Sequence, residues 1–216
     1  MNSVVRIDLH THTSPRSPCS HIEPLELIRE ADRLQLDGIC LTEHQEVWQP
    51  EEVDELAQGA QVRIFRGNEF TTNQGDILVF GYEQDIKELL IIEELRDRVQ
   101  AAEGFMIAAH PFRGFKTFGI GQLQMTVEQA CQRKVFDFVD AIEIGNGKLS
   151  DEENDMATQV AAQLGLPGTA SSDAHRVDEV GKRTTHFERE IGSERELIEE
   201  LRAGRFALAN QAGPGA

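Results

Sequence analysis

The chain has 216 residues, of which 39% are hydrophobic and 27% are charged, which is the composition of an ordinary globular domain. The formal net charge of −17 repels polyanions and disfavours an extended nucleic-acid-binding surface. The N-terminus carries no basic segment followed by an apolar stretch, and no run of about 18 apolar residues occurs, so we expect a cytoplasmic protein without membrane contact. Cys19, Cys40 and Cys131 are an odd, widely spaced set, typical of reduced thiols.

Short apolar runs alternate with helical periodicity along the chain. Strands are predicted over residues 4–9, 38–42, 62–66, 76–81, 105–109, 138–144, 167–171 and 206–209. Helices are predicted over residues 24–36, 51–58, 85–103, 126–134, 150–164 and 193–203, with Pro24 in a first turn and with Ser150 and Ser193 as N-caps. The alternation indicates an α/β fold of parallel units, and about seven such units suit a closed barrel better than an open sheet. We expect a single domain over residues 1–210 and a loose tail over 211–216.

Metal-binding residue types follow most of the predicted strands. His10 and His12 come after the first strand, and side chains two residues apart in an extended segment share a face. The residues at equivalent points of later strands are Glu43, His44, Glu69, His110, Glu143, Asn146, Asp173 and His175. The carboxyl ends of parallel strands meet at one edge of a sheet or barrel. Imidazole and carboxylate are ligands of zinc, manganese and iron, so the pattern predicts a catalytic metal centre.

Other residues near these positions have two interpretations. His21 fits a loop residue ahead of the helix at Pro24, and Trp48 fits either the lining of a pocket or the cover of a rim. Residues 113–125 are typical either of a mobile loop over the pocket or of a plain connector. Arg113, in HPFRGFK, is the best-placed cation for a substrate phosphate, since guanidinium pairs with phosphate through two hydrogen bonds. The further candidates for substrate binding are Arg16, Lys116, Arg176 and Asn146; simple surface exposure explains the three cations equally well.

Six motifs resemble those of a known family. DLHTHT, GICLTEH, GNEFTT, AAHPFR, DAIEIGNG and SSDAH occur in this order between about residues 5 and 183. They are similar to the successive motifs of the PHP domain, named for polymerase and histidinol phosphatase. The resemblance is to the stand-alone PHP proteins, usually described as metal-dependent phosphoesterases. It implies a distorted (β/α)7 barrel, related to the TIM barrel, that holds two or three divalent ions (Mn, Zn or Fe).

The same resemblance implies a division of ligands. One ion is served by His10, His12, Glu69 and Asp173; Glu69 bridges to a second ion with His110; His44 and His175 serve a third. Relatives often carry an acid or a histidine about five residues after the H-x-H pair, where this chain reads SPRSP, and His21 is the nearest substitute. Glu43 stands where relatives often have aspartate, in a supporting position behind the ligands. Asp76 follows Gly75 where some relatives have histidine, and we expect it to serve as an oxygen ligand in place of that histidine.

These residues point to phosphoester hydrolysis, on a monoester or a nucleotide-type substrate. A metal-bound hydroxide would attack phosphorus, and no side-chain nucleophile is indicated, because no serine, cysteine or threonine lies in a nucleophile-elbow context. The acidic composition favours a small phosphorylated molecule or a short oligonucleotide end as the substrate. There are two alternative hypotheses: an amidohydrolase-like enzyme acting on a C–N bond, and a regulatory PHP module that binds metal without turnover.

Overall fold

The structure is a computed structural model, and it describes residues 4–114 and 125–208. Lys116, most of the predicted loop 113–125 and the predicted tail 211–216 lie outside the described residues. Within these residues, no helix combines the length and the apolar character needed to cross a bilayer.

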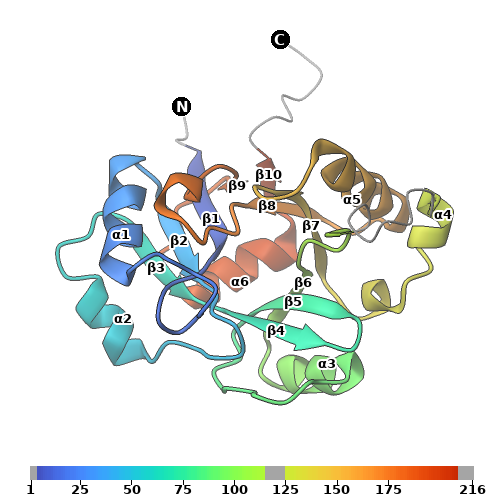
Figure 1. Ribbon diagram of the computed structural model, residues 1–216, viewed down its shortest axis with the longest axis horizontal. Helices are drawn as coiled ribbons and strands as arrows, with labels where there is room; N and C mark the ends of the chain where they lie inside the picture. The colour runs from blue at the N-terminus through green and yellow to red at the C-terminus, as the bar shows by residue number, and fades with distance from the viewer. Residues whose placement is uncertain (1–3, 115–124, 209–216) are drawn as a thin grey trace, which may run out of the picture.

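The described strands form two five-stranded sheets (Figure 1). The first has the order β10 (Phe206–Leu208), β9 (Thr185–Phe187), β1 (Val5–Thr11), β2 (Gly38–Leu41) and β3 (Arg63–Arg66). The second has the order β4 (Asn68–Thr72), β5 (Gly75–Phe80), β6 (Phe105–Ala108), β7 (Ala141–Asn146) and β8 (Gly168–Ser171). The strands β1, β2 and β3 are parallel, as are β6, β7 and β8.

The α/β class is confirmed, but the expected closed (β/α)7 barrel is not. One physical reason is β5, which runs antiparallel to both of its neighbours, β4 and β6. The turn between β4 and β5 ends at Gly75, whose φ of 116° lies in a region that favours glycine. The sequence analysis missed β4 and β9, because Glu69, Thr71 and His186 interrupt the apolar runs from which strands were predicted.

The two sheets meet where the candidate residues lie. Gly67 joins β3 to β4, and a Cβ atom on it would come within 2.8 Å of the Phe80 ring, so the close crossing needs glycine. Just beyond it, the backbone N–H of Glu69 donates to the carbonyl of Glu43 at 2.9 Å. On the other side, the backbone N–H of Asp173 donates to the carbonyl of His10 at 2.9 Å. These hydrogen bonds hold the carboxyl ends of β1, β2 and β8 and the start of β4 together.

Helices lie on the outer sides of the sheets, except for the last one, α6 (Glu194–Ala203), which packs among side chains of both sheets (Figure 1). Those of the described residues are α1 (Pro24–Arg33), α2 (Pro50–Leu56), α3 (Ile92–Ala101), α4 (Val127–Ala130), α5 (Asp151–Leu164) and α6 (Glu194–Ala203), with 3₁₀ turns η1 (Lys134–Asp137) and η2 (Val177–Glu179). Pro24 opens α1, and the hydroxyls of Ser150 and Ser193 accept hydrogen bonds from the N–H groups of Glu153 and Glu196, as predicted for N-caps. The helices expected over residues 85–103 and 126–134 are shorter than predicted.

Two of the three buried apolar clusters lie between the outer helices and the sheets, and the third lies between the two sheets, where Leu197 and Leu201 of α6 join it. Leu95 and Val99 of α3 belong to the cluster that also contains Phe70 of β4 and Met106 of β6. All four side chains are fully buried, and each contributes about 1.5–3 kcal/mol through its removal from water. This packing keeps the hairpin β4–β5 in place, and with it the start of β4 that carries Glu69.

Candidate metal centre

Seven predicted ligands come together at the junction of the two sheets. Among the described residues they form three overlapping groups, in each of which the ligand atoms lie within 4.8 Å of one another. The groups are His12, His44 and His175; His10, His12 and Asp173; and His10, Glu69 and His110. They come from five separate segments of the chain, so only the folded protein assembles them.

The nitrogens of the first two histidines lie at the middle of the cluster. His10 Nε2 and His12 Nε2 are 2.9 Å apart, as expected of two side chains on one face of a strand. Glu69 Oε2 lies 3.4 Å from the first and 3.2 Å from the second. The other oxygen of Glu69 is 2.8 Å from His110 Nε2, while His44 Nδ1 is 3.1 Å from Oε2. Glu69 therefore reaches four imidazoles with its two oxygens, which is the arrangement expected of a bridging carboxylate.

Three imidazoles of the cluster, those of His10, His12 and His175, have a hydrogen-bond partner at Nδ1. His10 Nδ1 lies 3.2 Å from Glu143 Oε1, and His12 Nδ1 lies 3.2 Å from Ser17 Oγ. His175 Nδ1 lies 2.9 Å from the backbone carbonyl of Asp173. A carboxylate or carbonyl next to Nδ1 keeps the proton there and leaves Nε2 as a lone pair, which is how proteins orient histidine ligands.

Two buried carboxylates, Glu143 and Glu43, support the ligands, and Glu143 joins more segments of the chain. It is fully buried and accepts hydrogen bonds from the backbone N–H of His110 at 2.7 Å and from Asn146 Nδ2 at 2.9 Å, in addition to contacts with His10 and the Ser171 hydroxyl. The sequence analysis placed Glu143 at a strand end but assigned it no role. The only sequence signal for a supporting role of Glu143 was its position on a predicted strand. A buried carboxylate on β7 needs hydrogen-bond donors, and the fold supplies them from four segments.

In the described part of the chain, the Glu43 carboxylate forms no hydrogen bond with a candidate ligand but lies beside Ser17, which contacts the His12 ring. It is fully buried and accepts from Thr13 N at 3.0 Å, Ser17 Oγ at 2.5 Å and Trp48 Nε1 at 3.0 Å. Trp48 is thus a buried residue whose indole N–H donates to Glu43.

The charges of the centre favour a cation. Burial alone lowers the pKa of His10, but the neighbouring Glu69 and Glu143 carboxylates outweigh burial and raise this pKa to about 10. Burial raises the pKa of Glu143, but His10 outweighs it and lowers this pKa to about 2. Burial, together with His12 and Lys148 nearby, lowers the pKa of His175 to about 3. The carboxylates that stabilise a proton on His10 also stabilise a divalent ion, whereas His175 is a neutral lone-pair donor.

Asp173 provides a direct test of whether the residues fit a metal ion. Its Oδ1 atom is buried and has no hydrogen-bond partner among the described residues. The nearest imidazole nitrogens, those of His10, His12 and His175, lie 3.5–3.6 Å away. A buried carboxylate oxygen without a donor costs about 1–3 kcal/mol or more, and a cation among these lone pairs removes that cost. The donor set, imidazole and carboxylate, fits divalent ions.

The backbone is also unusual at two of the seven positions. His110 has a φ of 28° and Asp173 a φ of 55°, values that non-glycine residues rarely adopt and that cost about 1–3 kcal/mol where they persist. Each residue lies two positions after the end of a strand of the second sheet. The strained turns aim these two side chains into the cluster, which is a recurrent feature of functional sites.

Two further predicted ligands lie outside the groups. His21 is exposed, and it joins none of the three groups formed by described residues; its backbone N–H donates to the carbonyl of His175 at 2.9 Å. Asp76 is half-buried, joins none of these groups, and accepts from Thr71 Oγ1 at 2.8 Å. As metal ligands, both expectations find no support in the geometry, because the chain path after His12 turns His21 outward and the reversed strand β5 engages Asp76 with its hairpin neighbour.

The candidate substrate-binding residues differ in position. Arg113 contacts Asp173 Oδ2 through its guanidinium, and its side chain is 41% exposed. Asn146 is buried, and its Nδ2 donates to Glu143 Oε2 at 2.9 Å and to Asp173 Oδ2 at 3.2 Å. Its amide thus links two carboxylates of the centre. Arg16 stacks 4.0 Å above the Trp48 ring and pairs with Glu52 at 2.6 Å. Arg176 is exposed and pairs with Asp178 at 3.3 Å.

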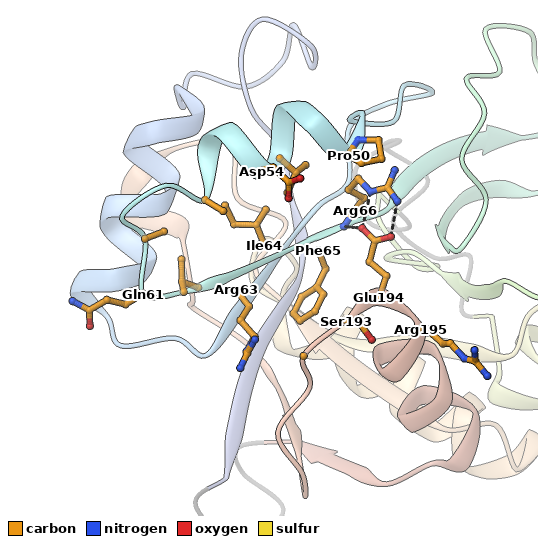
Figure 2. Close-up of a pocket in the computed structure, with 15 residues that line it drawn as sticks. Pro50, Asp54, Gln61, Arg63, Ile64, Phe65, Arg66, Ser193, Glu194 and Arg195 are labelled. Atoms are coloured by element: carbon orange, nitrogen blue, oxygen red, sulfur yellow. Dashed lines mark hydrogen bonds and ion pairs between the residues drawn. The ribbon is translucent and has the colours of Figure 1, made fainter.

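Two hollows differ in their relation to this centre. One, of about 220 Å³, is lined by His110 and Arg113 together with Asp76 and Arg133, and it adjoins the metal-binding cluster. The other, of about 840 Å³, lies between α2, β3 and the start of α6 (Figure 2). Figure 2 shows Arg66 paired with Glu194 at its edge, at 2.7 Å. None of the seven predicted ligands lines this second hollow, so its size does not make it the functional site.

Comparisons with known proteins identify the family of the chain. A family model described as "PHP domain" matches residues 8–130, more than half of the chain, and a model described as "PHP-associated" matches residues 151–206. The chain is 26% identical over 117 residues to the uncharacterized protein MJ1587 of Methanocaldococcus jannaschii, which covers 50% of this chain and 68% of that protein. The chain therefore belongs to the PHP domain family.

Solved structures share the fold. A two-domain protein of Bacteroides vulgatus, described as containing a predicted PHP-like metal-dependent phosphoesterase, has a TM-score of 0.70 at 22% identity over 95% of this chain. This chain spans 64% of that protein, less than two thirds of its length. The lesion-specific endonuclease EndoQ of Pyrococcus furiosus has a TM-score of 0.66 at 18% identity, over 95% of this chain and 58% of its own. An amidohydrolase of Chromobacterium violaceum has a TM-score of 0.65 at 16% identity, over 96% of this chain and 99% of its own.

Proposed function

We propose that this protein is a metal-dependent hydrolase of a phosphoester, acting on a monoester or a nucleotide-type substrate. The observation that carries the proposal is the cluster of five histidines and two carboxylates, in which Asp173 Oδ1 is buried without a hydrogen-bond partner among the described residues. The family supports a metal-dependent phosphoesterase, and the solved structures with the same fold include proteins described as a phosphoesterase, an endonuclease and an amidohydrolase.

The seven residues would hold two or three divalent ions. The group of His10, His12 and Asp173 would hold one ion, and Glu69 would link it to a second at His10 and His110; His12, His44 and His175 would hold a third. Bound there, the ions would supply a water acidified towards neutrality and positive charge for the phosphate oxygens. Glu143 and the Asp173 carbonyl would keep the ring protons of His10 and His175 on Nδ1, so that both rings present a lone pair.

Arg113 would bind the substrate phosphate. Its guanidinium already contacts a carboxylate of the centre, Asp173, and its side chain is 41% exposed. An arginine in this position can donate two hydrogen bonds to a phosphate that enters from solvent. The adjoining hollow of about 220 Å³ beside His110 has room for the alcohol portion of the phosphoester. With a net charge of −17, the protein favours a small phosphorylated molecule or a short oligonucleotide end over a long polyanion.

The test is turnover by the Mn²⁺-loaded protein on phosphomonoesters, phosphodiesters and nucleotides, with Asp173→Ala beside the wild type. Asp178→Ala is the matched control, since Asp178 is exposed and pairs only with Arg176 among the contacts described. We expect Asp173→Ala to abolish turnover and Asp178→Ala to leave it unchanged. A wild-type protein that binds two or more ions per chain and hydrolyses no ester would overturn the proposal. C–N substrates, and a regulatory role without turnover, would then be tested.

A further inference from the structure

We propose that Ser17 is a positioning residue: it keeps the ring proton of His12 on Nδ1 and fixes His12 and His44 relative to one another. The inference rests on the proposed function, because it concerns how two candidate ligands are held. Ser17 lies five residues after His12, in the loop between β1 and α1, and its side chain is fully buried.

The hydrogen bonds of Ser17 leave one arrangement of its proton. Its Oγ lies 2.5 Å from Glu43 Oε2, 3.2 Å from His12 Nδ1 and 3.2 Å from the backbone nitrogen of His44. A hydroxyl has one proton to donate and two lone pairs that accept. The His44 N–H occupies one lone pair, and the carboxylate of Glu43 receives the proton. The remaining lone pair faces His12, so Nδ1 of His12 must be the donor.

Glu43 cannot reverse this arrangement, because its other neighbours are donors. Thr13 N lies 3.0 Å from Oε2, and Trp48 Nε1 lies 3.0 Å from Oε1. All of these groups belong to fully or nearly fully buried residues, so water does not compete for them. A carboxylate surrounded by donors accepts from Ser17, and a short hydrogen bond to a carboxylate is among the stronger ones in proteins.

The consequence for His12 is a defined lone pair on Nε2. That atom lies 2.9 Å from His10 Nε2 and 3.5 Å from Asp173 Oδ1, at the middle of the cluster. If the His12 proton moved to Nε2, it would occupy the position that the metal needs. Ser17 also accepts from the His44 backbone, and the His12 and His44 rings lie with their centroids 4.5 Å apart. The Ser17 hydroxyl thus positions two of the three histidines in the group of His12, His44 and His175.

The test compares Ser17→Ala with Ser20→Ala. Ser20 is a matched control, since it is buried in the same loop and its hydroxyl donates to the backbone carbonyl of His12 at 2.8 Å, not to the ring. Stepwise Zn²⁺ and Mn²⁺ titrations, with bound metal counted after dialysis, give the affinity of each site. We expect Ser17→Ala to weaken at least one ion by about 10- to 100-fold, the usual cost of losing a residue that orients a ligand. Ser20→Ala should leave the affinities within about threefold.

Nitrogen-15 spectra of the imidazoles in the Zn²⁺-loaded wild type supply a readout independent of activity and of the folding of any variant. We expect His12 to carry its proton on Nδ1, slowly exchanging with water, and to bind metal through Nε2. A His12 that binds through Nδ1 would overturn the inference, and so would a Ser17→Ala protein with unchanged affinities. If the wild type binds no divalent ion, the proposed function itself fails, which is distinguishable from a failure of the Ser17 inference alone.

Discussion

Glu143→Gln tests whether a buried carboxylate orients the centre. The side chains have nearly the same shape, but the substitution removes a charge and replaces one acceptor oxygen by an NH₂ group that donates. Oε1 of Glu143 faces His10 Nδ1 at 3.2 Å and the Ser171 hydroxyl. Oε2 faces the His110 N–H at 2.7 Å and Asn146 Nδ2 at 2.9 Å.

The magnitude follows from these partners. If the new NH₂ takes the Oε2 position, the His110 N–H and Asn146 Nδ2 both face a donor and lose their acceptor. Each lost hydrogen bond then costs about 1–3 kcal/mol of stability. If it takes the Oε1 position, the Ser171 hydroxyl rotates, and His10 must accept at Nδ1, which moves its proton to Nε2. The second arrangement costs less in the metal-free protein, but it blocks the nitrogen that faces the cluster. We therefore expect metal affinity to fall by about 10- to 100-fold, which equals about 1.4–2.7 kcal/mol of metal-dependent stability.

The assay is urea unfolding with and without a fixed excess of Mn²⁺, combined with a direct metal titration. Glu199→Gln is the control, because Glu199 is 53% exposed and its ion pair with Arg195 joins two residues of one helix, a kind of contact that contributes little. The metal-dependent gain in free energy of unfolding should shrink in Glu143→Gln and stay constant in Glu199→Gln. An unchanged gain and an unchanged affinity in Glu143→Gln would refute the idea that Glu143 orients His10.

Three further expectations concern metal and fold. Removal of metal with a chelator should lower the free energy of unfolding by about 2.7 kcal/mol relative to protein with free Mn²⁺ at 100 times its Kd. A Tm that is the same with and without metal would contradict a metal site in the folded protein. Gly104→Ala should destabilise the protein by about 1–3 kcal/mol in urea unfolding, because its Cβ would lie 2.6 Å from the Phe80 carbonyl oxygen and 2.7 Å from a Val99 methyl; equal stability would mean that the backbone shifts freely there. Ser150→Ala should cost about 1 kcal/mol in the same assay, since the hydroxyl caps α5, and no loss would show that the cap is dispensable.

Much of the local structure follows from short-range signals. Pro24 at the start of α1 and the serine caps of α5 and α6 are found where the residue types predict them. The helix predicted over residues 85–103 begins only at Ile92. In the observed helix Ile92, Leu95 and Val99 provide the buried face, whereas Ile86 and Leu90 enter the same apolar cluster from an irregular segment ahead of it. Boundaries are thus less determined than the elements themselves.

The sheet arrangement depended on contacts distant in sequence. Nothing in residues 76–81 indicates direction, and β5 runs antiparallel because the tight turn at Gly75 returns it along β4. The same reversal pairs Asp76 with Thr71 in place of the metal cluster. Which strand lies beside which is decided by packing against helices and by loop length, and neither is visible in a strand's own residues.

The sequence by itself determined the seven residue types of the candidate centre, because imidazoles and carboxylates recur directly after apolar runs and strand ends converge in α/β folds. The tertiary structure alone decided how they are supported. Ser17 and Glu143 became partners of His12 and His10 only when loops and strands from separate parts of the chain met, and His21, close in sequence, was turned to the surface. A ligand is recognised by its chemistry, whereas the residue that orients it is recognised by its contacts, and contacts exist only in the folded chain.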